Sequence, residues 1–385
     1  MDNLALTLVV VFAGVVLLPP LAARLRMPVI VLELLFGIAI GRSSFNIIPD
    51  SPIIDFFSAF GLTYLMFLAG MEIDMSKINR AIMKKVLAIA LASIAVPFIC
   101  GVALSYWVKM NPFLLGTILS TTSLGLVLPI LKDLRLTRRQ SQILLASVIV
   151  VDIASMFLLA FVLAALQGTL EVRFIYSVLA IFVLFLVPWF IKKQKLRRKF
   201  TTKLWKKQYG EMEMRAAFAI IFLLGAISFR LGFHSIIGAF IAGLLVSEIL
   251  PRAVLQQEKL QSFGYSFFIP LFFIFIGAEV NLRPVFSSLN NLAILFAIIA
   301  IGILAKVLSV TIACRFSGFK MRQSLAFGLF HTARLSLIIA AVGISLELKL
   351  IDDNLFAIFI ILAVVSASLA PSLGKYVLTR NDQNP

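Results

Sequence analysis

The chain has 385 residues, of which 61% are hydrophobic and only 14% are charged, and its formal net charge is +17. Soluble domains contain about 45–50% apolar and about 25% charged residues, so this composition excludes a water-soluble enzyme. It also excludes a disordered chain, because 35 phenylalanines and few charges are the opposite of a solvating composition.

Long apolar runs dominate the sequence, and a membrane-spanning helix needs about 20 such residues. The first run is predicted to be a helix and not a signal peptide, because Asp2 precedes it and it lacks a basic start and a small-residue cleavage site. We therefore expect an all-α membrane protein with thirteen transmembrane helices, at residues 4–22, 28–41, 53–71, 83–108, 112–131, 139–167, 174–191, 213–231, 234–250, 260–279, 289–314, 322–346 and 354–378.

Lysine and arginine fall mainly on one side of these helices, in the odd-to-even loops and at the C-terminus, with a dense run at Lys192–Arg215. The opposite side holds Arg42, Lys109, Arg173, Arg230, Arg283 and Lys349. Cytoplasmic loops are enriched in basic residues, so we expect the N-terminus outside and the C-terminus in the cytoplasm of a multi-pass plasma-membrane protein. Topology and lipid headgroups then explain the net charge, and no nucleic acid is expected.

In chain order, the first buried charge is predicted at Glu33, near the cytoplasmic end of the helix at 28–41. It either lines an inner funnel or interacts with the N-terminal dipole of that helix. The next unusual segment is Ser120-Thr121-Thr122-Ser123-Leu124-Gly125 in the helix at 112–131. Such a run makes a poor helix centre but a good source of ion-binding oxygens.

Asp152 lies at the middle of the helix at 139–167, in an otherwise apolar environment. A charge at the bilayer centre is costly and is a functional hypothesis by default, although a structural carboxylate is the alternative. At that depth one carboxylate can exchange a proton for a metal ion, so Asp152 is the main candidate for cation and proton binding.

Three further polar residues lie in the last helices. Lys306, at the centre of the helix at 289–314, is predicted either to neutralise a carboxylate or to neutralise the carbonyl ends of broken helices. Arg334 follows a polar interruption of the helix at 322–346, and because it cannot deprotonate we expect a fixed countercharge. His331 is expected to be a hydrogen-bonding residue, with pH sensing as the alternative.

Two short patterns recur along the chain. Gly70-Met71-Glu72-Ile73-Asp74 resembles Gly277-Ala278-Glu279-Val280-Asn281 at an offset of 207, and Gly37 and Gly243 lie in similar segments at an offset of 206. The offset pairs each helix with the seventh helix after it, so the two halves must have opposite topology. We therefore predict two six-helix inverted-topology repeats, in which the interrupted helices at 112–131 and 322–346 form a crossed broken pair.

The chain resembles the monovalent cation:proton antiporter-2 branch of the sodium/proton exchanger superfamily. The segments that carry the resemblance are 67–74, 121–125, Asp152, 238–243, 268–277 and Lys306, and it covers essentially the whole chain. It implies one exchanger domain at 1–379, with helices 1–6 (4–167) as one repeat, helix 7 (174–191) as a linker and helices 8–13 (213–378) as the other repeat.

The resemblance also implies a homodimer with a scaffold part, 1–71 and 213–279, and a mobile core part, 83–167 and 289–378, which moves as an elevator. By this resemblance, Asp152 matches the family's essential ion- and proton-binding aspartate. The family's unwound ion-binding segment corresponds to Thr121, Thr122 and Ser123, and the basic residue of its core corresponds to Lys306. Two departures are that Val151 precedes the aspartate and that Leu335-Ser336 follows Arg334.

The leading hypothesis is antiport of Na⁺ or K⁺ against H⁺, electroneutral because a single titratable carboxylate lies at the predicted midplane. The alternative is a potassium-efflux protein with channel-like behaviour that lacks its regulatory domain. An organic-solute symporter and a membrane sensor are less well supported, because the polar midplane residues suffice only for a small cation and no output domain is recognised. No enzymatic activity, cofactor or resident metal is expected; the partners are the transported ions and membrane lipids.

Overall fold

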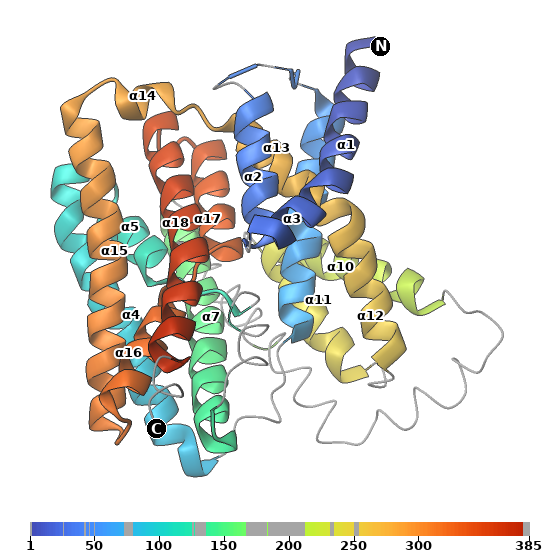
Figure 1. Ribbon diagram of the computed structural model, residues 1–385. Coiled ribbons are helices and arrows are strands. Elements are labelled where there is room, and N and C mark those ends of the chain that lie inside the picture. The colour runs from blue at the N-terminus through green and yellow to red at the C-terminus, as the bar shows by residue number, and fades with distance from the viewer. Residues whose placement is uncertain are drawn as a thin grey trace. The chain divides into compact units, whose positions relative to one another are not determined.

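The computed structural model describes residues 2–25, 27–41, 44–45, 47–49, 51–72, 80–124, 127, 136–166, 183, 212–231, 235–249 and 254–379. The regular elements in these ranges are all helices (Figure 1). They are α1 (Asp2–Leu25), α2 (Val29–Ile40), α3 (Pro52–Glu72), α4 (Arg80–Val108), α5 (Pro112–Ser120), α7 (Arg138–Leu166), α10 (Met212–Arg230), α11 (Ser235–Ile249), α12 (Val254–Phe263), the π-helical η2 (Gly264–Phe268), α13 (Ile269–Glu279), α14 (Arg283–Phe286), α15 (Leu289–Phe316), α16 (Met321–Thr332), α17 (Ser336–Glu347) and α18 (Asp353–Thr379).

Most of the predicted helices coincide with observed ones to within a few residues. The predicted helix 174–191 lies outside the described residues apart from Val183, as does most of the basic run that follows it. The predicted span 260–279 coincides with Glu258–Glu279 to within two residues, but the helix begins earlier, at Val254, and η2 separates α12 from α13. Pro270 has no N–H for the preceding turn, which accounts for the wider π-turn just before it.

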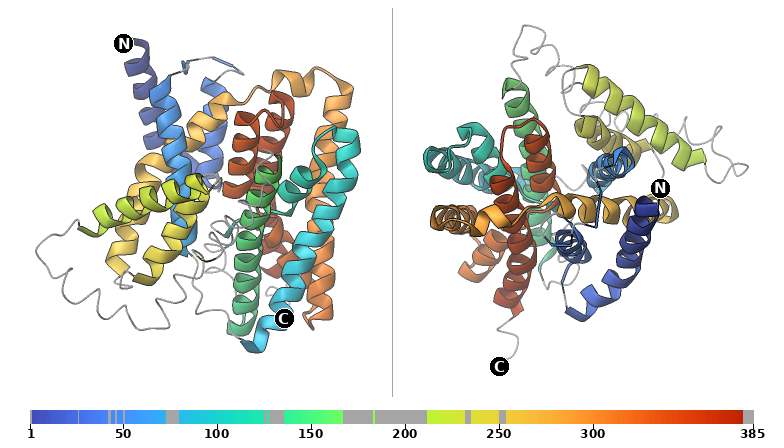
Figure 2. Two further views of the ribbon diagram at one scale, coloured as in Figure 1. Left: turned by 180° about the vertical axis from the view of Figure 1, so that it is seen from behind. Right: turned by 90° about the horizontal axis from the view of Figure 1, so that it is seen from above.

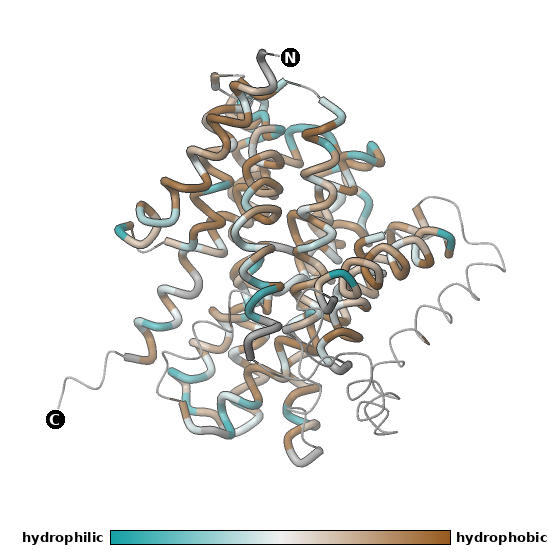
Figure 3. The backbone as a smooth tube through the Cα atoms, turned by 90° about the vertical axis from the view of Figure 1, so that its right-hand side faces the viewer, coloured by the Kyte–Doolittle hydropathy of each residue, from teal (hydrophilic) through white to brown (hydrophobic). Residues whose placement is uncertain are grey.

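Eight described helices are long and apolar enough to cross a membrane, judged by length and composition. They cover Ala5–Leu25, Pro52–Met71, Ile82–Val108, Arg139–Leu166, Glu258–Glu279, Leu289–Phe316, Met321–Glu347 and Asp353–Leu378. The shorter apolar helices are Val29–Ile40 and Ser235–Ser247. Apolar residues extend along most of the helices, as Figure 3 shows, which matches a lipid environment.

The contacts divide the chain into two compact units. Unit 1 comprises Met1–Pro49, Lys77–Val162 and Ile274–Pro385, and unit 2 comprises Asp50–Ser76 and Leu163–Phe273. The boundaries fall inside α7 and α13, so each of these helices contributes to both units.

In unit 1, α4 packs against both α5 and α15, and α16 packs against α15 and α18 (Figures 1 and 2). Two glycines allow the closest approaches. A Cβ on Gly116 of α5 would lie 2.9 Å from the Phe98 carbonyl of α4, and one on Gly328 of α16 would lie 2.7 Å from the Val307 carbonyl of α15. Backbone-to-backbone packing of this kind is common between membrane helices, which lack a hydrophobic driving force for association.

In unit 2, α11 packs against α3 and α10. Gly70 of α3 lies against the Phe240 carbonyl of α11, and Gly243 of α11 lies against the Phe67 carbonyl of α3. An aromatic cluster joins α3, α10, α12 and η2. Its members are Phe60, Tyr64, Phe218, Phe263 and Phe268, and the Tyr64 hydroxyl donates to the Leu260 carbonyl at 3.0 Å.

Two helices end in the interior of unit 1. The side chain of Asn111 accepts hydrogen bonds from the N–H groups of Phe113 and Leu114, and Pro112 occupies the first turn, so α5 begins there in the manner expected of a capped helix. Nine residues later α5 stops, and Thr121 is extended, with φ −60° and ψ 154°. Similarly, α16 ends at Thr332 and the chain is extended at Ala333 before α17 begins at Ser336.

Candidate ion-binding site

Asp152 lies in the middle of α7 and is almost fully buried, with 6% of its surface exposed. Its carboxylate receives a hydrogen bond from the backbone N–H of Leu124, the residue that follows the extended segment after α5. Lys306 lies close enough to interact electrostatically with the carboxylate. Among the described residues, Asp152 and Glu33 are the acidic side chains that are buried.

The two helix interruptions lie directly against each other. The N–H of Ser123 donates to the carbonyl of Ala333 at 2.9 Å, and the Thr122 hydroxyl donates to the carbonyl of His331 at 3.0 Å. Thr121, Thr122 and Ser123 are all buried. The structure thus brings together the three predicted oxygen-bearing residues and the polar interruption beside Arg334.

Lys306 joins α15 to the end of α5. Its Nζ donates to the carbonyl of Ser120 and, at 2.5 Å, to the carbonyl of Thr121. These carbonyls end a helix, where the backbone carries partial negative charge, so a buried ammonium group is stabilised there. Lys306 therefore lies at the carbonyl end of α5 and also near Asp152.

Arg334 is fully buried between the ends of α16 and α17. Its Nη2 donates to the carbonyl of Gly302 in α15, and its own carbonyl accepts from the Ser366 hydroxyl of α18 at 3.2 Å. Its Nε and Nη1 have no hydrogen-bond partner in the part of the chain that the structure describes. Lys306 and Arg334 lie near enough to interact electrostatically, so the described site brings together two basic side chains and one carboxyl group.

His331 makes hydrogen bonds through both ring nitrogens. Nδ1 donates to the carbonyl of Phe327 at 2.9 Å, and Nε2 lies 3.1 Å from the hydroxyl oxygen of Ser147 in α7. This is the arrangement expected of a hydrogen-bonding residue. It connects the last turn of α16 to the helix that carries Asp152.

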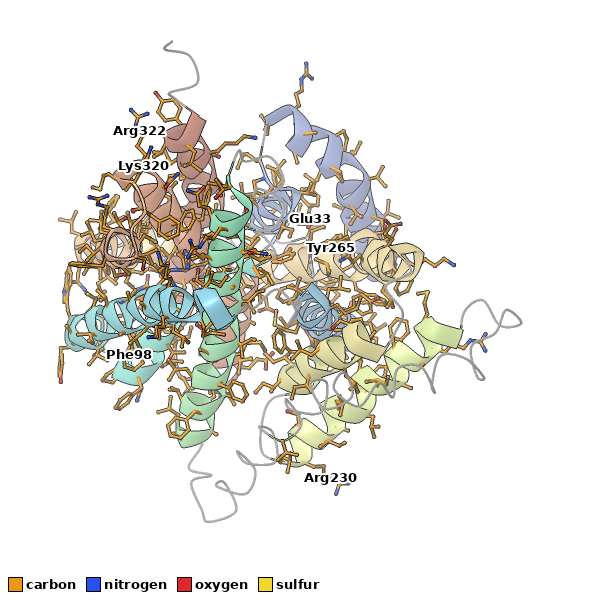
Figure 4. The ribbon with its side chains drawn as sticks, turned by 90° about the horizontal axis from the view of Figure 1, so that it is seen from below. Glu33, Phe98, Arg230, Tyr265, Lys320 and Arg322 are labelled. Atoms are coloured by element: carbon orange, nitrogen blue, oxygen red, sulfur yellow. The ribbon has the colours of Figure 1, made fainter. Side chains whose placement is uncertain are left out.

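Glu33 belongs to α2 and is buried, and its Oε2 has no hydrogen-bond partner among the described residues (Figure 4). It lies four residues after Val29, the first residue of α2. Within the described residues, no hydrogen bond or ion pair joins Glu33 to Asp152 or to the interrupted helices, so Glu33 is not part of this site.

Several participants were not found from the sequence. Gly302 lies one turn before Lys306 in α15 and accepts from Arg334 through its carbonyl. Leu124 and Gly302 both act through backbone atoms, and a backbone atom leaves no residue-type signal in a sequence. Ser147, in contrast, was visible as a serine one and a half turns before Asp152, but its partner His331 is 184 residues away.

The described residues contain no group of three or more histidine, cysteine, aspartate or glutamate side chains able to hold a metal ion. What the site offers is one carboxylate, several hydroxyl groups and the backbone of interrupted helices. Oxygen ligands of this kind suit a hard monovalent cation. The same carboxylate can also bind a proton.

A family model described as "Sodium/hydrogen exchanger, transmembrane" matches residues 8–380 of the chain. YjbQ of Bacillus subtilis is 32% identical over 398 residues, which cover 99% of this chain and 64% of YjbQ. The Na⁺/H⁺-K⁺ antiporter GerN of Bacillus cereus is 29% identical over 374 residues, which cover 94% of this chain and 93% of GerN.

Among solved structures, the fold is similar to that of the sodium proton antiporter MjNhaP1 of Methanocaldococcus jannaschii. The TM-score is 0.68, the sequence identity is 18%, and the match covers 97% of each chain.

Proposed function

Because this chain belongs to the sodium/hydrogen exchanger transmembrane family, we propose that it is a secondary antiporter that exchanges Na⁺ or K⁺ for H⁺. The family is one of multi-pass membrane transporters, so the chain is a transporter and not an enzyme. The family has no cofactor, and the transported ions are its substrates. The observation that carries the proposal is the buried carboxylate of Asp152 beside two interrupted helices.

In this proposal Asp152 binds cation and proton in competition. Either ligand neutralises the carboxylate itself, and only the loaded site crosses the membrane. Competition at one carboxylate is enough to couple the two fluxes in opposite directions. No second binding step is required.

Thr121, Thr122 and Ser123 supply further oxygens to the cation. Asp152 offers at most two, and a dehydrated monovalent cation needs several. The hydroxyl of Thr122 donates its proton to the His331 carbonyl, which leaves the oxygen lone pairs available. The extended backbone at Thr121 supports the same role, because its peptide groups lie outside the helical hydrogen-bond pattern.

Lys306 and Arg334 act as countercharges. Lys306 is held by the carbonyls of Ser120 and Thr121, and these do not change when Asp152 exchanges a proton for a cation. We therefore propose that Lys306 keeps its proton throughout and that exchange is electroneutral, one cation for one proton.

Glu33, buried on α2 with an unpartnered oxygen, is proposed to line the cytoplasmic funnel to the site.

We propose thirteen transmembrane helices in two inverted six-helix repeats. Equivalent contacts support this. Gly37 lies against the Ile274 carbonyl and Gly243 against the Phe67 carbonyl. Gly37 and Gly243 differ by 206 residues, while Phe67 and Ile274 differ by 207.

A second pair of contacts follows the same rule. Gly277 lies against the Leu34 carbonyl and Gly70 against the Phe240 carbonyl. Applying the same two offsets to Gly70 and Leu34 gives Gly277 and Phe240. The contacts between α2 and α13 thus correspond, one by one, to those between α11 and α3.

We further propose that residues 1–71 and 213–279 form a scaffold and that 83–167 and 289–378 form a core that moves as an elevator. The candidate site is built within the core segments, from α5, α7, α15, α16 and the extended segments after α5 and α16, which is what a moving site requires. The chain is proposed to work as a homodimer in the plasma membrane, in contact with lipid. Exposed Lys320 and Arg322 at the beginning of α16 (Figure 4) are consistent with a cytoplasmic C-terminal side.

The test is ion exchange by purified protein in liposomes that contain a pH-sensitive dye, with Na⁺, K⁺ and Li⁺ added in turn. The unaltered protein should produce a cation-dependent change of luminal pH, and Asp152→Asn should abolish it. Asp55→Asn, which removes an exposed carboxylate from the first turn of α3, is the matched control and should leave exchange intact. Cation-dependent proton flux that persists in Asp152→Asn would contradict the proposal.

A further inference from the structure

Ser155 is a buried serine of α7, three residues after Asp152. None of its surface is exposed, and its Oγ has no hydrogen-bond partner within the described ranges. Residues three apart lie on the same face of a helix, and helical side chains tilt toward the N-terminus. The hydroxyl of Ser155 is therefore directed back toward the turn that carries Asp152.

Ser155 differs from most of the other buried serines in the described helices. A helical serine ordinarily satisfies its hydroxyl by donating to a carbonyl three or four residues earlier. Five buried serines in the described helices do so: Ser105, Ser120, Ser309, Ser324 and Ser345. Ser155 donates to neither of the corresponding carbonyls, those of Val151 and Asp152.

A buried hydroxyl without a partner costs free energy, and such a group calls for a specific explanation. Packing alone does not supply one, because an alanine would fill nearly the same space without the penalty. A ligand that binds beside Asp152 does supply one. Both lone pairs of the oxygen are available, since no donor in the described part of the chain reaches them.

We propose that Oγ of Ser155 is a direct ligand of the monovalent cation bound at Asp152. The inference rests on the proposed antiport function and adds one residue to its binding site. A hydroxyl oxygen is a hard, neutral ligand that suits Na⁺ and K⁺ and adds no charge to the site. When a proton occupies the carboxyl group instead, the same oxygen accepts a hydrogen bond from it, so Ser155 has a partner in both loaded states.

The experiment compares Ser155→Ala, Ser155→Cys and Ser155→Thr. Thr retains the hydroxyl, Ala removes it, and Cys replaces hard oxygen by soft sulfur at nearly the same size. The matched control is Ser345→Ala in α17, which removes a buried hydroxyl that donates to the Ala341 carbonyl at 2.6 Å. Two quantities are measured: the apparent KM for Na⁺ and K⁺ in proteoliposomes, and the rise in thermal unfolding midpoint that each ion produces in detergent.

Loss of one such ligand should raise the apparent KM of the Ala and Cys variants about fivefold to tenfold while the maximal rate changes less. The ion-dependent rise in midpoint should shrink in both, since ligand stabilisation depends on affinity. Ser155→Thr and Ser345→Ala should behave like the unaltered protein in both measurements.

An unchanged KM and an unchanged midpoint rise in both Ser155→Ala and Ser155→Cys would overturn the inference while leaving the proposed function standing. An equal loss in the Ser345→Ala control would also overturn it, because the effect would then be structural. Failure of the proposed function has a different signature, in which the unaltered protein shows neither exchange nor ion-dependent stabilisation.

Discussion

At the scale of single residues, the site depends on the room left by a missing side chain as well as on charged groups. Gly302 is a glycine in the interior of α15, where alanine would ordinarily be the better helix former. A Cβ at this position would lie 3.1 Å from Nη1 of Arg334 and 3.4 Å from Leu119. The absence of a side chain therefore lets the guanidinium group reach the Gly302 carbonyl.

Gly302→Ala should displace Arg334 and weaken its hydrogen bond to the Gly302 carbonyl. Hydrogen bonds to charged groups contribute about 1.5–3 kcal/mol. If the transport barrier rises by about half of that energy, the maximal exchange rate should fall about tenfold. The measurement is the initial rate of cation-driven pH change in proteoliposomes. Gly343→Ala is the control, because its Cβ would meet Ile276 at an ordinary 3.6 Å. Full activity in Gly302→Ala would show that Arg334 has room to move.

At the scale of elements, interrupted helices need partners for the backbone groups that they leave open. The extended segment after α5 and the end of α16 satisfy each other through Ser123, Thr122, Ala333 and His331. Lys306 covers the carbonyl end of α5. Hydrogen bonds from α5, α15 and α16 therefore stabilise the two interruptions together.

Ser147→Ala should weaken the connection between α7 and α16, because the buried Nε2 of His331 loses its partner. We expect the free energy of unfolding to fall by about 1–3 kcal/mol. Thermal unfolding in detergent measures it. A double-mutant cycle with His331→Ala should show coupling between the two sites. Strictly additive losses would mean that the serine and the histidine stabilise the protein independently.

At the scale of the whole molecule, the proposed repeat predicts that equivalent positions tolerate equivalent changes. Gly37 and Gly243 each pack directly on a backbone carbonyl, that of Ile274 in one unit and that of Phe67 in the other. Neither carbonyl can move without shifting its helix. The two glycines should therefore be similarly intolerant of a side chain.

Gly37→Ala and Gly243→Ala should each lower the free energy of unfolding by about 1–3 kcal/mol, as overpacking typically does. The thermal midpoint in detergent measures the effect. Gly225→Ala is the control, since its Cβ would have only contacts of 3.6 Å or more and should be neutral or slightly stabilising. A large loss at one glycine and none at the other would argue against equivalent packing.

The proposed stoichiometry is also a property of the whole transport cycle. If Lys306 keeps its proton, the site carries the same charge with either ligand, and membrane potential should not change the exchange rate. A potassium–valinomycin potential imposed during Na⁺/H⁺ exchange tests this. Steep voltage dependence that disappears in Lys306→Gln would show that the lysine carries a second proton and that the exchange is electrogenic.

The sequence by itself determined the class of protein and most of the helices, because lipid requires long apolar runs and these are visible without a structure. It also identified the residues whose types are costly in a membrane, Asp152, Lys306 and Arg334, and all three are buried in unit 1. The interruptions near Thr121 and Ala333 were readable as well, since hydroxyl and polar residues lower helix propensity.

Only the tertiary structure decided which groups meet. Lys306 donates to carbonyls 185 and 186 residues away, and Thr122 donates to one 209 residues away. The acceptors are backbone atoms, which every residue type possesses, so no pattern in the sequence distinguishes them. The sequence also could not show the role of Gly302 or the lack of a hydrogen-bond partner at Ser155. Both depend on where the neighbouring helices lie, and helix packing determines that.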